Sequence, residues 1–125
     1  VRAMQIPIAN IEFIRLSSYG ATTVSSGAAA LLTGVKPEWV KDQEIVLVED
    51  IIDTGISTTT AIKYLQTHQP ASIKICALLD KPARRQVPVT IDYLGITVPD
   101  RFIVGYGIDF NEQYRQLPAI YTLPE

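Results

Sequence analysis

The sequence has very little cysteine and no excess of basic residues. A single cysteine among 125 residues excludes an internal disulfide and a cysteine-rich zinc site. Eleven lysine and arginine residues are outnumbered by thirteen acidic residues, which gives a formal net charge of -2. A general nucleic-acid-binding surface is normally basic, so we expect no nucleic-acid partner.

Long hydrophobic runs are also missing. No apolar stretch approaches the ~20 residues that a membrane-spanning helix needs, and no signal peptide is visible, so we expect a cytoplasmic protein without a membrane partner. With 47% hydrophobic and 19% charged residues, the composition is that of a globular protein with one domain. The chain begins with Val1 and not with methionine, and we expect it to begin partway into that domain.

The hydrophobic pattern predicts an α/β domain. The run "EIVLVE" (44–49) is apolar and rich in Val and Ile, which is typical of a strand buried on both faces. From about Ser57 to Pro70 the apolar residues recur at helical spacing, and "SIKICALLD" (72–80) predicts the next buried strand. Strand, helix and strand in this order form a βαβ unit. We therefore expect a central, largely parallel sheet flanked by helices.

The remaining segments give weaker signals. Shorter strands are predicted at residues 11–17, 91–96, 102–105 and 119–123, and a mobile loop at 17–27. Residues 28–32 could form a strand or a helix, and a strand is favoured. Ligands of such folds bind at the carboxyl ends of the parallel strands. The stretch "VEDIIDTGIST" (48–58) lies at such an end.

This stretch combines an acidic cluster with a turn that suits an anion. Asp53 is followed by "TGIST" (54–58), where the free N–H groups and the dipole of a helix N-terminus favour phosphate. An ordinary N-cap at Ser57 or Thr58 is the alternative interpretation. Glu49 and Asp50 precede this turn. Because carboxylates only accept hydrogen bonds, they suit a ligand with several hydroxyls.

A phosphate beside a diol describes a ribose 5-phosphate. The sugar would separate the acidic residues from the phosphate, and a divalent metal would relieve the remaining negative charge. Asp53 would be left to act on whatever is attached at C1' of the sugar.

The stretch "IVLVEDIIDTGIST" (45–58) resembles the phosphoribosyl pyrophosphate signature of the type I phosphoribosyltransferase family. Further segments resemble its hypoxanthine-guanine members and follow in the same order: "SSYG", "TVSSG", "LLDKPARR", "LGITVPDRFIVGYGIDFNEQYRQLP" and "AIYTL". The resemblance extends from about residue 8 to residue 123. It implies a single domain over residues 1–125, with the amino-terminal portion of the family domain missing.

The resemblance implies purine salvage, in which phosphoribosyl pyrophosphate and a purine base give a purine nucleoside 5'-monophosphate and pyrophosphate. Asp53 would be the general acid/base at N7 of the purine. Other contacts implied are Glu49 and Asp50 on the ribose hydroxyls, Thr54, Gly55, Ile56, Ser57 and Thr58 around the 5'-phosphate, Lys81 at the 6-oxo group, and Phe102 and the Ile103 backbone at the base.

The resemblance also implies a magnesium ion and a lid. Mg2+ would be coordinated by Asp109 together with Glu49 and Asp50, and Arg115 would contact pyrophosphate. Ser18 and Tyr19 would belong to the lid. The family further implies a homodimer or homotetramer. Arg84 and Arg85 receive no role and are expected to be solvated surface charges.

Three other interpretations compete. "DTG" is typical of aspartic proteases, but a helix after "DTGIST" excludes their all-β fold. A response-regulator receiver domain would need its acidic pair after the first strand, and a lysine much further along than Lys81 lies from Asp50. A non-catalytic, nucleotide-sensing regulator with the same fold stays open. The choice among hypoxanthine, guanine and xanthine also stays open.

Overall fold

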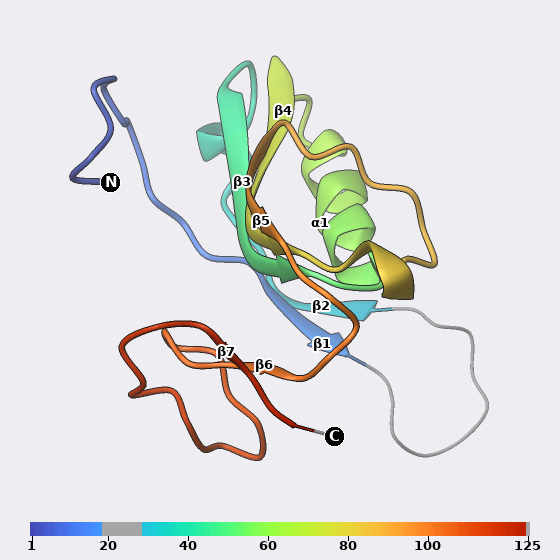
Figure 1. Cartoon of the computed structure of the whole chain (residues 1–125). Coiled ribbons are helices and arrows are strands. Elements are labelled where there is room, and N and C mark those ends of the chain that lie inside the picture. The colour runs from blue at the N-terminus through green and yellow to red at the C-terminus, as the bar shows by residue number, and fades with distance from the viewer. Residues whose placement is uncertain (19–28, 125) are drawn as a thin grey trace. The chain divides into compact units, whose positions relative to one another are not determined.

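The computed structural model describes residues 1–18 and 29–124. The chain forms two compact units (Figure 1). One comprises Val1–Val46 with Ile56–Ile73, and the other comprises Leu47–Gly55 with Lys74–Glu125.

The first unit contains an antiparallel strand pair and a helix. Strands β1 (Arg15–Ser18) and β2 (Ala29–Thr33) pair with each other, and helix α1 (Ile56–Gln66) contacts both. The buried residues of α1 are Thr58, Ala61 and Leu65, whose spacing places them on one helical face. The hydroxyl of Tyr64 accepts from the N–H of Val35 at 2.9 Å and donates to its carbonyl at 3.1 Å. This residue therefore fastens the segment after β2 to the helix.

Two predictions for this unit need correction. The strand expected at residues 11–17 is wrong for residues 11–14, which are irregular, while Ser17 and Ser18 belong to β1 and not to a loop. Phe13 is 82% exposed, so the apolar side of the alternating pattern is not buried there. The remaining residues of the predicted mobile loop, 19–27, lie outside the described residues. The strand predicted at 28–32 is confirmed as β2.

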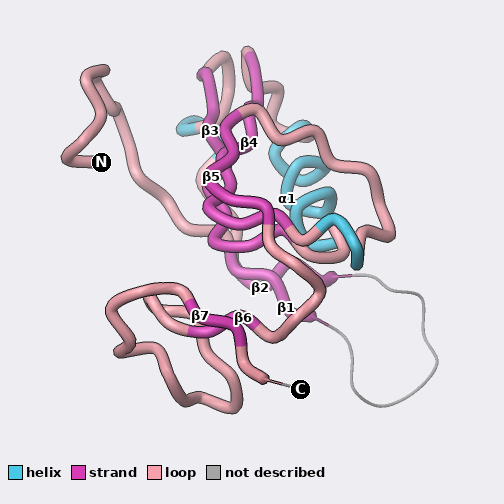
Figure 2. The backbone as a smooth tube through the Cα atoms, viewed as in Figure 1, coloured by secondary structure: helices cyan, strands magenta, loops and turns pink. Residues whose placement is uncertain are grey.

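A three-stranded sheet has the order β3 (Glu44–Ile52), β4 (Ser72–Asp80) and β5 (Tyr93–Thr97). Strands β4 and β5 run parallel, with Cys76 opposite Tyr93 and Leu79 opposite Ile96. Figure 2 shows these strands and α1, which follows β3 and precedes β4 in the chain. The predicted α/β fold with a parallel central sheet is confirmed. A helix after "DTG" also removes the aspartic-protease interpretation.

The second unit has its core where β3 and β4 end. Ile52, Leu79 and Val104 are its largest fully buried side chains. Val104 belongs to a short antiparallel pair, β6 (Ile103–Val104) with β7 (Tyr121–Thr122). A 3-10 turn (Pro82–Arg84) follows β4, and a second one (Pro37–Trp39) lies in the first unit.

The expectation that β3 is buried on both faces is wrong. Val46 is 45% exposed and Val48 is 70% exposed, whereas Ile45 and Leu47 are half-buried. A continuous apolar run shows that both faces of a strand are apolar, but it does not show that both are covered. Of the helices expected to flank the sheet, the described residues contain one α-helix, α1.

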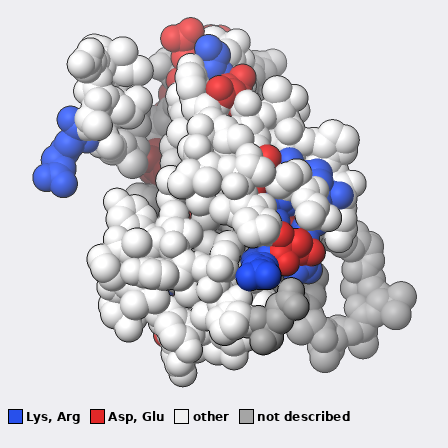
Figure 3. Space-filling view, viewed as in Figure 1, with Lys and Arg blue, Asp and Glu red and all other residues white. Residues whose placement is uncertain are grey.

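Charged side chains of both signs are scattered over the face shown in Figure 3, separated by larger uncharged areas. Within residues 1–18 and 29–124, no helix is long and apolar enough to cross a membrane.

Candidate active site

The acidic cluster lies at the carboxyl end of β3, as the sequence predicts. Glu49 and Asp50 are among the last four residues of the strand, and Asp53 is the first residue after it. Neighbouring residues of a strand point to opposite faces. Glu49 is half-buried, whereas Asp50 is exposed and its Oδ1 accepts from the N–H of Ile51 at 2.7 Å. The strand therefore presents the two carboxylates in different surroundings.

The turn from Asp53 to Gly55 is tightly held. The carbonyl of Thr54 accepts from the N–H groups of Gln86 at 2.9 Å and Val87 at 3.0 Å. Gly55 has a φ of 84°, a left-handed conformation that favours glycine. A Cβ at this position would clash with the carbonyl oxygen of Val87. Glycine is thus required here both by backbone conformation and by the close approach of residue 87.

The three hydroxyl residues predicted around the phosphate differ in burial. Ser57 is exposed, Thr54 is half-buried and Thr58 is only 3% exposed. Thr58 therefore packs on the buried face of α1, and its side chain does not lie at the surface of the turn. Ile56, which begins the helix, is half-buried.

Asp53 has a carboxylate oxygen without a hydrogen bond from the described residues, and a cation lies beside it. Its Oδ1 is a buried atom that has no hydrogen-bond partner among the described residues. The Nε of Arg84 lies 3.6 Å from this oxygen. The Arg84 side chain is 50% exposed and the Asp53 side chain is 38% exposed. An ionised carboxylate only accepts hydrogen bonds. The Asp53 side chain is therefore suited to accept a hydrogen bond from a ligand.

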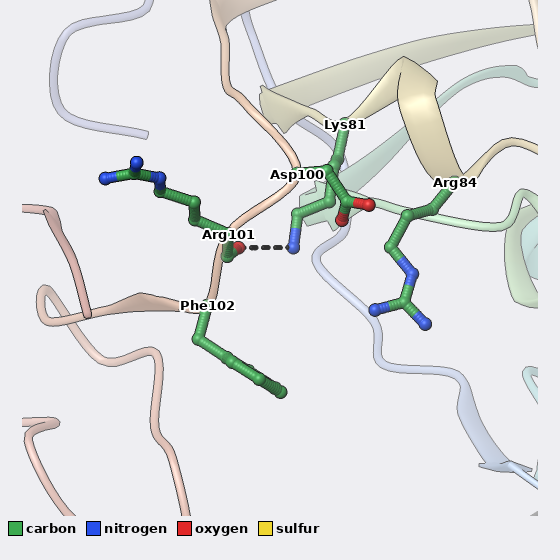
Figure 4. A pocket seen from close by; sticks show the side chains of 5 residues that line it. All are labelled: Lys81, Arg84, Asp100, Arg101 and Phe102. Atoms are coloured by element: carbon green, nitrogen blue, oxygen red, sulfur yellow. Dashed lines mark hydrogen bonds between the residues drawn. The ribbon is translucent and has the colours of Figure 1, made fainter. Parts of the chain in front are cut away.

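Lys81 lines a small pocket. The pocket has a volume of about 230 Å3 and is lined by Lys81, Arg84, Asp100, Arg101 and Phe102. Only 6% of Lys81 is exposed, and its ammonium donates to the carbonyl of Arg101 at 2.7 Å (Figure 4). In the same view the guanidinium of Arg101 points away from the other lining side chains. Of the pocket's cations, Lys81 is the one held by burial and a hydrogen bond.

Phe102 and Ile103 continue this site. Phe102 is 59% exposed and meets Phe110 edge-on, with ring centroids 4.9 Å apart. Ile103 is buried and pairs with Thr122 in the β6–β7 ladder. An exposed aromatic ring beside a pocket is available to stack on a flat ligand.

The residues predicted to hold magnesium do not form a cluster. Asp109 Oδ1 lies 2.9 Å from an Arg115 guanidinium nitrogen, and Asp109 Oδ2 accepts from the N–H of Glu112 at 2.8 Å. Among residues 1–18 and 29–124, no three histidine, cysteine or acidic side chains are placed to hold a metal ion. The structure therefore does not bring Asp109 together with Glu49 and Asp50. Arg115, predicted to contact pyrophosphate, also donates to the carbonyl of Gly107 at 3.0 Å.

The lid residues lie at the limit of the described chain. Ser18 is the last residue of β1, and Tyr19 lies outside the described residues.

Sequence reasoning missed Arg85. Its side chain is only 18% exposed and forms an ion pair with Asp80, so the expectation of a solvated surface charge is wrong. Its Nε donates to the carbonyl of Asp53 at 2.9 Å, and one terminal nitrogen donates to that of Ile52 at 3.1 Å. The available signal was Asp80, an acidic residue at the end of a buried strand that needs a partner. Arg84, by contrast, is half-exposed as expected but lies beside Asp53.

Comparison with known proteins agrees with this arrangement. Residues 3–111 match the phosphoribosyl transferase domain family. Hypoxanthine-guanine phosphoribosyltransferase of Crithidia fasciculata is 43% identical over 118 residues, which cover 94% of this chain and 56% of that protein. A crystal structure of the Bacillus anthracis enzyme of the same name superimposes with a TM-score of 0.80 at 43% identity, covering 90% of this chain and 65% of the other.

A third similar structure contains a nucleotide. It is the Leishmania tarentolae enzyme in complex with GMP, which matches with a TM-score of 0.68 and 43% identity over 71% of this chain and 52% of the other. The chain thus spans between about half and two thirds of the length of these three relatives.

Proposed function

Because this chain belongs to the phosphoribosyl transferase domain family, we propose that the whole protein transfers the 5-phosphoribosyl group of phosphoribosyl pyrophosphate to a 6-oxopurine. The products would be IMP or GMP and pyrophosphate, which makes the reaction one of purine salvage. The observation that carries this proposal is the buried, hydrogen-bonded Lys81 that lines a pocket flanked by an exposed aromatic ring.

Lys81 supports a 6-oxopurine in preference to adenine. An ammonium group has donors but no acceptor, so it pairs with the oxygen at position 6 of hypoxanthine or guanine. The amino group of adenine would meet it donor to donor. Phe102 would stack on the base, and the backbone of Ile103 would meet its Watson–Crick edge. These contacts are shared by hypoxanthine, guanine and xanthine, so the site leaves the order of preference among them open.

The turn and the helix start support the phosphate assignment. Residues 54–58 run from the Thr54–Gly55 turn into the first residues of α1, and helix N-termini attract anions through N–H groups and the helix dipole. In the proposed complex this segment binds the 5'-phosphate, with the exposed Ser57 hydroxyl as a donor and Thr58 supporting the segment from its buried side. Glu49 and Asp50 would accept hydrogen bonds from the ribose hydroxyls.

The chemistry of the transfer fits these groups. Departure of pyrophosphate develops positive charge on the ribose, which nearby carboxylates stabilise electrostatically. The purine nitrogen then forms the new bond at C1', and Asp53 manages the proton at N7 as general acid/base. The Oδ1 of Asp53, buried and without a hydrogen bond from the described residues, supports this role. A lid that includes Ser18 and Tyr19 would exclude water from the activated sugar.

A magnesium ion would arrive with its substrate, because the described residues form no cluster of three possible metal ligands. Mg2+ is usually held by one or two carboxylates together with substrate phosphates and water, and Asp109 is the candidate ligand, with Glu49 and Asp50 assisting at the ribose. When bound, such an ion neutralises the charge of the pyrophosphate. Arg115 would exchange its contact with Asp109 for one with pyrophosphate. We also propose a cytoplasmic homodimer or homotetramer, on the resemblance to the family alone.

The test is an activity assay on the whole protein with phosphoribosyl pyrophosphate and Mg2+, using hypoxanthine, guanine, xanthine and adenine in parallel. We expect nucleotide formation with at least one 6-oxopurine and much less with adenine. Titration with IMP by calorimetry measures binding separately. Absence of both turnover and IMP binding would exclude the proposed function, whereas IMP binding without turnover would favour the regulatory alternative.

A further inference from the structure

Three consecutive carbonyl groups, from the last residue of β3 to the second residue after it, accept hydrogen bonds from one short segment of the chain. The carbonyls of Ile52 and Asp53 accept from the guanidinium of Arg85 at 3.1 and 2.9 Å. The next carbonyl, that of Thr54, accepts from the N–H groups of Gln86 and Val87. Residues 85–87 therefore make four hydrogen bonds to the turn that carries Asp53.

Fixing these carbonyls also fixes the N–H groups of the turn. In a planar trans peptide the C=O of one residue and the N–H of the next point in opposite directions. The carbonyl of Ile52 is held by Arg85 and by the N–H of Lys81 at 3.0 Å, and the carbonyls of residues 53 and 54 are held by residues 85–87. The N–H groups of residues 53–55 are therefore directed to the other side of the turn. This is the side from which an anion would have to approach the backbone.

Arg85 is itself held in one orientation. Its guanidinium pairs with Asp80, the last residue of β4, and is largely buried. A guanidinium is planar and offers several donors in a rigid arrangement, whereas the ammonium of lysine is a compact point charge. One arginine can therefore bind a carboxylate and two carbonyls at once, a combination that lysine cannot reproduce.

We propose that Arg85 is a positioning residue, which holds the Asp53–Gly55 turn in the conformation that binds the 5'-phosphate and presents Asp53. The ligand in this proposal, the 5'-phosphate, rests on the proposed function, whereas the hydrogen bonds of Arg85 do not. It gives a role to an arginine that the sequence leaves without one. The ion pair with Asp80 orients Arg85, and the bonds to the two carbonyls carry the effect.

Two single variants of the whole protein separate these contributions. Arg85→Lys keeps a positive charge beside Asp80 but loses the planar set of donors. Asp80→Asn removes the ion pair but leaves the guanidinium able to reach the carbonyls. We expect Arg85→Lys to weaken IMP binding and lower kcat by roughly 10- to 100-fold, since small misplacements of reacting groups cost up to ~10²-fold. Asp80→Asn should lower both less than Arg85→Lys does, because the guanidinium can still reach the two carbonyls, although it loses the ion pair that orients it. Arg2→Lys, at an exposed arginine, is the matched control.

Hydrogen exchange gives a readout without any ligand. In the parent protein the amides of Gln86 and Val87, which donate to the carbonyl of Thr54, should exchange slowly, and in Arg85→Lys they should exchange at least ~10-fold faster because the turn opens more often. If Arg85→Lys does not fold, the double variant Asp80→Asn/Arg85→Gln removes both charges and leaves no buried charge unpaired. It should show the same faster exchange.

The outcomes distinguish the two proposals. A parent protein that fails to bind IMP contradicts the proposed function, while exchange at the amides of Gln86 and Val87 still tests the role of Arg85. Unchanged exchange and unchanged IMP affinity in Arg85→Lys would overturn the positioning role. A larger loss in Asp80→Asn than in Arg85→Lys would also overturn it, because Arg85→Lys keeps the positive charge beside Asp80 and the ion pair alone would then matter.

Discussion

One carboxylate oxygen of Asp53 is buried without a hydrogen-bond partner among the described residues, and the nearest cation is Arg84. Asparagine has a similar shape but cannot take up a proton. We therefore expect Asp53→Asn in the whole protein to lower kcat by ~10²–10⁴-fold, the usual contribution of a general acid/base. Binding of phosphoribosyl pyrophosphate should weaken much less. Steady-state kinetics across pH measure both effects.

Asp42→Asn is the matched control for this substitution. Asp42 is exposed and has a φ of 58°, a conformation that asparagine adopts readily. Its replacement should leave kcat unchanged. A near-normal kcat for Asp53→Asn at every pH would remove Asp53 from the chemistry.

Lys81 allows a prediction about base selection. Lys81→Met keeps a long side chain in the buried position but removes the ammonium group. Because a hydrogen bond to a charged group is worth ~1.5–3 kcal/mol, IMP affinity should fall by roughly 10- to 100-fold, while AMP affinity should change little. Calorimetric titrations of both nucleotides measure the change in preference, with the exposed Lys63→Met as control. An unchanged ratio of IMP to AMP affinity would show that Lys81 does not contact position 6.

At the scale of single elements, the turn between β3 and α1 can be compared with another glycine turn. Gly55 and Gly107 have similar φ angles, 84° and 96°. A Cβ at Gly55 would clash with Val87, whereas a Cβ at Gly107 meets nothing within 4 Å. We expect Gly107→Ala to cost about 1 kcal/mol of unfolding free energy from backbone conformation alone. Gly55→Ala should cost more and should also weaken IMP binding.

Thermal unfolding and IMP titration of these two variants test this expectation. Equal losses of stability would show that the contact between residues 55 and 87 does not constrain the turn.

The elements that sequence predicts well are those whose signal is local. The order β3, α1 and β4 follows from a change of hydrophobic period between residues 44 and 80, and the structure has the same order. The exposure of a side chain, by contrast, is not determined by the local sequence. Val48 is as apolar as a core residue but is 70% exposed, because coverage of a strand depends on what other parts of a protein pack against it.

At the scale of the whole molecule, base and sugar phosphate are expected to touch different stretches of the chain. Hypoxanthine should slow hydrogen exchange at residues 102–104, and ribose 5-phosphate should slow it at residues 53–58, since bound groups suppress local opening. IMP should protect both stretches. Exchange measured by mass spectrometry with each ligand in turn tests this expectation. Protection of residues 102–104 by ribose 5-phosphate alone would contradict the assignment of the pocket to the base.

The site shows where prediction from sequence stops. The positions of Asp53, Gly55 and Lys81 follow from their places directly after β3 and β4. The sequence does not predict that Arg85 pairs with Asp80 and with the carbonyls of Ile52 and Asp53. These contacts depend on how residues 52–53 and 80–85 meet in three dimensions. Sequence patterns place residues on elements, but they leave open which side chains share a hydrogen-bond network.

The hydrogen bond between Lys81 and the carbonyl of Arg101 has a consequence for the thermodynamics of binding. A free lysine side chain samples many rotamers, and restricting it costs up to ~2 kcal/mol of conformational entropy. Here that loss has occurred during folding, because the buried ammonium is already held at 2.7 Å from its acceptor. A purine that binds beside it meets an ordered donor, so the entropy of this side chain does not oppose association.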